Sequence, residues 1–106
     1  MNNMPLACDM TVFTPTKRDQ HVQATRDLLG SLQGIQPVKA GFEFLFASKT
    51  EIILQLAEFI ANERKCCPFL EFRLNILPNE QPISLTLTGP EGTPEFLREE
   101  FSEAFA

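Results

Sequence analysis

Hydrophobic and polar residues alternate in four short stretches of the chain, and this period of two predicts four β-strands. The four stretches are residues 6–13, 41–47, 70–76 and 83–88. In the first stretch, Cys8, Met10 and Val12 would share one face of the strand. The last two stretches flank a loop at residues 78–82, so we expect them to pair as an antiparallel β-hairpin.

A second pattern, with apolar residues three or four positions apart, predicts three helices. They are expected from Pro15 to about Leu32, from residue 49 to Cys66 or Cys67, and from residue 94 onward. Residues 48–51, Ser-Lys-Thr-Glu, have the form of a capping box at the start of the middle helix. That helix must end just before Pro68, because a proline disfavours the α conformation in the residue before it.

The predicted order of elements is β-α-β-α-β-β-α, which is typical of an α+β protein. Strands with one apolar and one polar face suit a sheet that is covered on one side only. We therefore expect a two-layer sandwich, with a four-stranded, mainly antiparallel sheet and the helices on one face. The helix between the second and third strands permits a right-handed parallel crossover. The length of 106 residues predicts a single domain over residues 1–106.

Composition and charge exclude several classes of partner. The chain has ten Phe, no Trp and no Tyr, so the core is expected to be built on phenylalanine. Its formal net charge is -5, and its one basic run is Arg64-Lys65. A surface that follows a nucleic-acid backbone needs clustered Lys and Arg, and an anionic membrane also attracts basic segments. We expect neither nucleic acid nor a membrane as a partner.

The sequence also bears on location. No stretch approaches the ~18–20 apolar residues that cross a bilayer. Residues 1–7 lack the basic and apolar regions of a signal peptide, so a cytoplasmic protein is expected. Three cysteines are an odd number, which fits a reducing compartment better than a disulfide framework.

The adjacent pair Cys66-Cys67 is the main candidate for chemistry, and Cys8 is the third cysteine. Free cysteines are often plain core residues, and that interpretation stays open for all three. As a vicinal dithiol, the pair would suit a thiophilic ion such as copper(I), mercury(II) or arsenic(III). Strong activation of a thiol is not expected here, because the negative end of a helix dipole raises a thiol pKa, although Arg64 and Lys65 act against this.

Two further residues bear on this candidate site. Glu63 precedes the cysteine pair by three and four positions, so it lies on the same side of the helix. It is either an oxygen ligand or proton acceptor, or a solvated carboxylate. Zinc is a weaker candidate ion, because no spacing of Cys and His in the chain matches a zinc motif. His21 is expected to lie on the exposed polar face of the first helix.

Residues 63–97 carry a resemblance to a known family. They contain Glu-Arg-Lys-Cys-Cys-Pro-Phe-Leu-Glu-Phe at 63–72 and Leu-Thr-Leu-Thr-Gly-Pro-Glu-Gly-Thr-Pro-Glu-Phe-Leu at 85–97. This resembles a family of small uncharacterised bacterial proteins with the signature E-R-x-C-C-P-F-x-x-F followed by L-x-L-T-G-P-E-G-x-x-E-F-L. Similar proteins also have a cysteine close to the N-terminus. The resemblance implies no activity, but it implies that Cys8, Glu63, Cys66 and Cys67 act as one unit.

Three functional hypotheses follow, in decreasing order of preference. The first is binding of a soft metal or metalloid ion by Cys66 and Cys67, with Cys8 and Glu63 as further ligands. The second is a non-enzymatic interaction module with core cysteines, forming a homodimer through a strand edge or a Phe-rich surface. The third is a thiol-redox enzyme or sensor, in which one cysteine attacks and another resolves. A role other than catalysis is therefore favoured.

Overall fold

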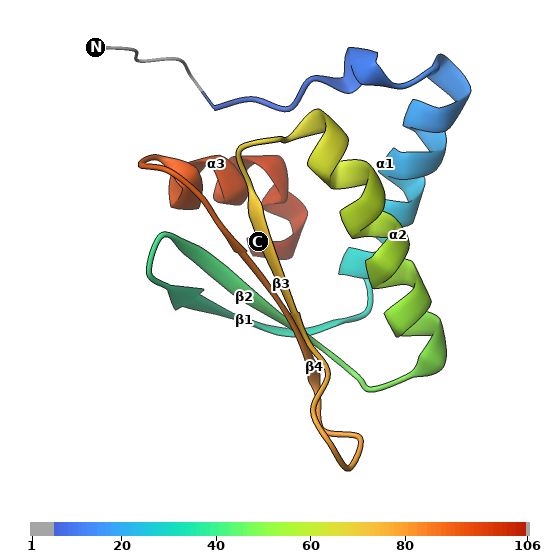
Figure 1. Cartoon of the computed structure of the whole chain (residues 1–106), viewed down its shortest axis with the longest axis vertical. Coiled ribbons are helices and arrows are strands. Elements are labelled where there is room, and N and C mark those ends of the chain that lie inside the picture. Colours follow the sequence, from blue (N-terminus) through green and yellow to red (C-terminus); the bar gives the residue numbers. More distant parts are fainter. Residues whose placement is uncertain (1–5, 106) are drawn as a thin grey trace.

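The computed structural model of the chain describes residues 6–105, which form three α-helices and a four-stranded antiparallel sheet (Figure 1). The strands are β1 (Leu32–Val38), β2 (Gly41–Phe46), β3 (Glu71–Asn75) and β4 (Ile83–Thr88). The helices are α1 (Pro15–Leu29), α2 (Thr50–Cys66) and α3 (Thr93–Glu100), with the 3-10 turns η1 (Met10–Val12) and η2 (Ser102–Phe105). The predicted α+β class is confirmed.

The strands lie in the order β1-β2-β4-β3, and each neighbouring pair is antiparallel. β3 and β4 form the predicted hairpin. Because β2 and β3 both run antiparallel to β4, they are parallel to each other, and α2 connects them across β4. The helix between these strands therefore forms a crossover between two parallel strands.

One face of the sheet carries the apolar core. Three cross-strand pairs of β2 and β4 form its centre, each side chain at most 3% exposed: Phe42 with Leu87, Phe44 with Leu85, and Phe46 with Ile83. Phe101, which follows α3, contacts both Phe44 of the sheet and Phe59 of α2. The helices thus cover this face, and α1 packs beside α2 (Figure 1). The expected two-layer arrangement and phenylalanine core are both present.

The first predicted strand does not form, and another segment supplies the fourth strand of the sheet. Residues 6–9 are irregular and residues 10–12 form η1, so the strand expected at residues 6–13 is absent. The sheet instead takes its fourth strand from β1, which the sequence pattern did not indicate. β1 contains Gly34 and Pro37, two residues that weaken a strand signal. It lies at the sheet edge, where a proline is tolerated because one side of the strand has no ladder to complete.

Helix ends agree with the sequence at some points and differ at others. Thr14 caps α1, with its hydroxyl accepting a hydrogen bond from the Lys17 amide at 3.2 Å. α1 ends at Leu29 rather than near residue 32, because the chain turns at residues 30–31 to enter β1. The capping box at residues 48–51 is wrong, since α2 begins at Thr50 and its N-cap Lys49 makes no side-chain capping bond. Within residues 6–105, no helix has the length and apolar character needed to cross a membrane.

Candidate functional site

The buried stripe of α2 runs into polar residues at its C-terminal end. Its members follow one another at spacings of four and three: Ile52, Leu56, Phe59, Glu63 and Cys66. This spacing keeps side chains on one face of a helix. Glu63 therefore occupies a core position and is only 4% exposed. The alternative that it is a solvated carboxylate is wrong.

The end of α2 places the second cysteine of the pair. Cys67 is the C-cap residue, and its amide still donates to the Glu63 carbonyl at 2.8 Å. Its backbone then leaves the helical conformation, with φ -123° and ψ 70°, as expected for a residue that precedes a proline. The predicted helix end is confirmed. Because Cys66 lies inside the helix and Cys67 lies at its cap, the two adjacent side chains both reach the carboxylate of Glu63.

An irregular N-terminal segment brings in the third cysteine. Residues 6–9 pass over the C-terminal end of α2 (Figure 1), and the Asp9 amide donates to the Cys66 carbonyl at 2.8 Å. That bond satisfies a carbonyl that the helix end would otherwise leave without a partner. Cys8 and Cys67 are joined in a disulfide, with their Cα atoms 4.6 Å apart. The odd number of cysteines favoured a reducing compartment over a disulfide framework, whereas the structure has this one disulfide and Cys66 is the free cysteine.

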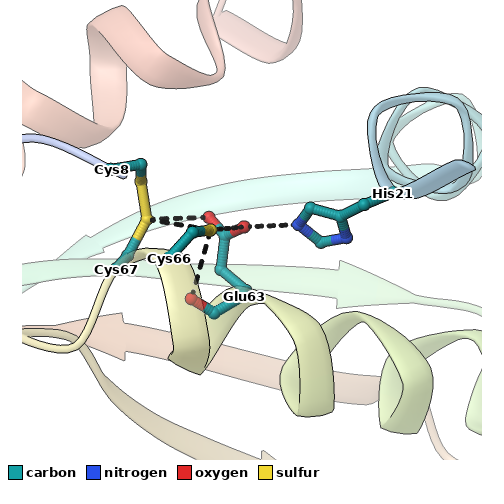
Figure 2. Close-up of a disulfide and its surroundings, with 5 residues drawn as sticks. All are labelled: Cys8, His21, Glu63, Cys66 and Cys67. Carbon is teal, nitrogen blue, oxygen red and sulfur yellow. Dashed lines mark hydrogen bonds and ion pairs between the residues drawn. A yellow bond between two sulfur atoms is a disulfide. The ribbon is translucent and has the colours of Figure 1, made fainter. Parts of the chain in front are cut away.

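The four predicted site residues meet at one point, as Figure 2 shows. One ligand atom from each of Cys8, Glu63, Cys66 and Cys67 lies within 4.8 Å of the others. The Cys66 sulfur is 3.5 Å from Oε1 of Glu63, and the Cys67 sulfur is 3.5 Å from Oε2. Cys66 and Cys67 are fully buried, whereas Cys8 is half-buried. The carboxylate therefore faces a compact group of sulfurs inside the protein.

His21 holds the other side of this carboxylate. Its Nε2 lies 2.8 Å from Oε1 of Glu63, and it is the partner to the right of the glutamate in Figure 2. A carboxylate oxygen only accepts, so Nε2 carries the proton and donates it. The ring packs between Phe13 and Phe59, at centroid distances of 5.4 and 5.9 Å. Among residues 6–105, Nδ1 has no hydrogen-bond partner.

The expected exposed position of His21 is wrong, because the side chain is 4% exposed. The spacing of α1 contains the missing signal. His21 precedes Thr25 by four residues and Leu28 by seven, so all three lie on the face that packs on the rest of the protein. Val22, the residue after His21 in α1, lies outside this face and is exposed. Helical spacing places His21 at a core position of α1 and Glu63 at a core position of α2. This is the sequence signal from which a buried pair could have been predicted.

Burial and negative charge both act on the free thiol. Burial, followed by the charge of Glu63, raises the pKa of Cys66 from 9.0 to about 12. The pKa of Glu100 is also raised, by desolvation and then by the charges of Glu63 and Glu99. Cys66 is therefore protonated at neutral pH, which agrees with the expectation from the sequence that this thiol is not strongly activated. Negative charge gathers around the sulfurs, and a bound cation would relieve it.

Comparisons of the chain with protein-family models, with curated proteins and with solved structures found no match. The resemblance of residues 63–97 to a bacterial family therefore stays a prediction.

Proposed function

We propose that this protein binds a soft metal or metalloid ion through Cys8, Cys66 and Cys67, with Glu63 as an oxygen ligand. One observation carries the proposal: ligand atoms of these four residues all lie within 4.8 Å of one another. Residues of the kinds that coordinate soft ions thus converge from two parts of the chain. The disulfide uses two of the sulfurs, so the binding form is the reduced protein, with all three cysteines free.

The burial of Glu63 and His21 argues against the second hypothesis, in which the cysteines are ordinary core residues of an interaction module. Burial of Cys66 and Cys67 fits either interpretation, since free cysteine is commonly buried. Burial of a carboxylate does not, because removing an ionised group from water is costly unless it is paired or coordinates a metal. A leucine at position 63 would fill the stripe without that cost. The histidine that orients the carboxylate resembles the partners that commonly hold metal-binding side chains in position.

The donor set favours thiophilic ions. Thiolates select soft metals, and three converging sulfurs suit mercury(II), arsenic(III) or copper(I). Zinc is the harder alternative, since three sulfurs and one carboxylate oxygen would complete its four-coordinate shell. Binding must remove the thiol protons, and the raised pKa of Cys66 makes this removal costly at neutral pH. Ions that form the strongest bonds to sulfur are therefore expected to bind best.

The test is a titration of the reduced protein, kept free of oxygen, with arsenite, mercury(II) or copper(I). We expect one ion per chain and a rise in sulfur-to-ion charge-transfer absorbance, which is easily seen because the chain has no Trp or Tyr. The control is the Cys66→Ser/Cys67→Ser variant. A second matched pair is Glu63→Gln against Glu58→Gln, since Glu58 is an exposed residue of the same helix. Equal binding by the wild type and the double cysteine variant would refute the proposal.

A further inference from the structure

We propose that this ion site is under redox control: oxidation that joins Cys8 to Cys67 expels the ion, and reduction restores the site. This inference rests on the proposed function and adds a regulation to it. Its basis is that the same two sulfurs take part in both states. Cys8 and Cys67 are bonded to each other in the structure, and they are also two of the four ligand residues.

The two states exclude each other for a chemical reason. A thiolate binds a soft ion with a lone pair and a negative charge, and a disulfide sulfur has no such charge. Once Cys8 and Cys67 are joined, the donors that remain are Cys66 and Glu63. Two donors cannot surround an ion that three sulfurs held before. Oxidation therefore removes most of the site without changing the fold around it.

Access to the sulfurs is unequal, and this decides where an oxidant acts first. Cys66 and Cys67 are 0% exposed, whereas Cys8 is half-buried. Cys8 also lines an open hollow of about 440 Å³, together with residues 6–7, Phe96, Glu99 and Glu100. A small oxidant in solution can reach the Cys8 sulfur from this hollow, but α2 and its packing cover the other two. Cys8 is thus the cysteine that the oxidant reaches first, and Cys67 is the resolving cysteine.

The backbone allows Cys8 to change partners. Its segment, residues 6–9, belongs to no helix or strand, and the amide of Asp9 ties it to the Cys66 carbonyl. Cys67 lies at the cap of α2, outside the regular helix. A shift between ligand and disulfide positions therefore breaks no strand ladder. Cys66, by contrast, is fixed in the last turn of α2, and a disulfide with its sequence neighbour would strain the peptide between them. It is expected to remain a thiol.

The oxidant class that we assign is a hydroperoxide, and the chemistry balances. The Cys8 thiolate attacks one peroxide oxygen, so an S–O bond forms as the O–O bond breaks, and the alkoxide or hydroxide that leaves takes a proton from solvent to become an alcohol or water. The Cys67 sulfur then attacks the sulfenic acid at Cys8. The S–S bond forms, hydroxide leaves, and it takes a proton from solvent to become water, because ion binding has already removed the proton of Cys67. The two thiolate sulfurs together lose two electrons to the peroxide, and the released ion takes no part in this electron transfer.

The experiment compares arsenite binding by three samples of the full chain. The first is reduced, the second is treated with hydrogen peroxide and then desalted, and the third is reduced again after that treatment. We expect one bound arsenic in the first and third samples. In the second, affinity should fall by about tenfold or more, because two sulfur ligands are lost. Peptide mapping of the second sample should find the Cys8–Cys67 disulfide, with Cys66 still open to alkylation after denaturation.

Variants separate this mechanism from general oxidative damage. Cys8→Ser removes the accessible thiol, so its weaker binding should be insensitive to the same dose of peroxide. Cys66→Ser leaves both partners in place and should still form the disulfide. Redox control is overturned if the oxidised wild type carries this disulfide and binds arsenite as tightly as the reduced protein, or if mapping finds another pairing. Absence of binding by the reduced wild type is a different result, which overturns the proposed function itself.

Discussion

The sheet core and the end of α2 are buried to the same degree, yet they are built on different principles. Phe46 and Leu87 of the core are each 1% exposed, and Cys66 and Glu63 of the site are 0% and 4% exposed. In the core, the apolar side chains gain by leaving water. In the site, a carboxylate and a histidine lose by it and recover only part of the loss through their own hydrogen bond. A buried position identifies a site only when burial opposes the group that occupies it.

The largest expected effect belongs to the core. Phe46→Ala should lower the free energy of unfolding by about 3–5 kcal/mol, since it removes a large buried ring and leaves a cavity. This is a large share of the stability of a domain of this size. Chemical denaturation followed by circular dichroism measures it. Leu54→Ala is the control, because Leu54 is 65% exposed, and its effect should be small. A similar loss in both variants would show that the core is not where the packing places it.

A double variant tests whether the site is maintained at the expense of stability. Replacing the buried pair by apolar residues of similar volume, His21→Leu/Glu63→Met, should leave the free energy of unfolding unchanged or raise it by about 1–4 kcal/mol. The same variant should bind arsenite more weakly in its reduced form, because the oxygen ligand is gone. Denaturation of the reduced, ion-free protein and an arsenite titration check the two parts. A strong loss of stability would contradict the contrast between site and core.

His21 alone should matter for binding through the orientation of Glu63. We expect His21→Ala to weaken ion binding about 10–100-fold, which is the usual effect of losing the partner that orients a ligand. His21→Gln keeps a donor at this position and should recover part of the affinity, which a purely structural role would not predict. The control is Gln23→Ala, an exposed position of the same helix. Equal binding by the Ala and Gln variants would exclude an orienting role.

The smallest effect at neutral pH concerns the titration of Cys66, which acts only in alkaline solution. Its pKa is raised from 9.0 to about 12, so the folded protein keeps the proton where the unfolded chain releases it. The free energy of unfolding should therefore fall as pH rises from about 9 towards about 12. In protein with the Cys8–Cys67 disulfide intact, alkylation of Cys66 should stay slow up to strongly alkaline pH. Glu63→Gln should move its onset to lower pH, and rapid alkylation of folded wild type near neutral pH would contradict the assignment.

Local patterns in the sequence predicted the elements that depend on local physics. The alternation in residues 41–47 and in the two strands of the hairpin survives in β2, β3 and β4, since each strand has one face that is more buried than the other. The end of α2 at Cys66 follows from the steric effect of Pro68 on the residue before it. By contrast, residues 6–13 alternate like a strand but find no partner strand, and β1 with its glycine and proline does. Pairing with β2 outweighed local preference in that case.

The sequence by itself determined the α+β class, the phenylalanine core, and the placement of Glu63 beside Cys66 and Cys67, because helix periodicity links residues three and four positions apart. Only the tertiary structure decided that Cys8, 59 residues from Cys67 along the chain, reaches this helix end. It also decided that His21 meets Glu63 across the contact of α1 with α2. The physical reason is common to both: contacts between distant segments depend on how elements pack, and no local period encodes that packing.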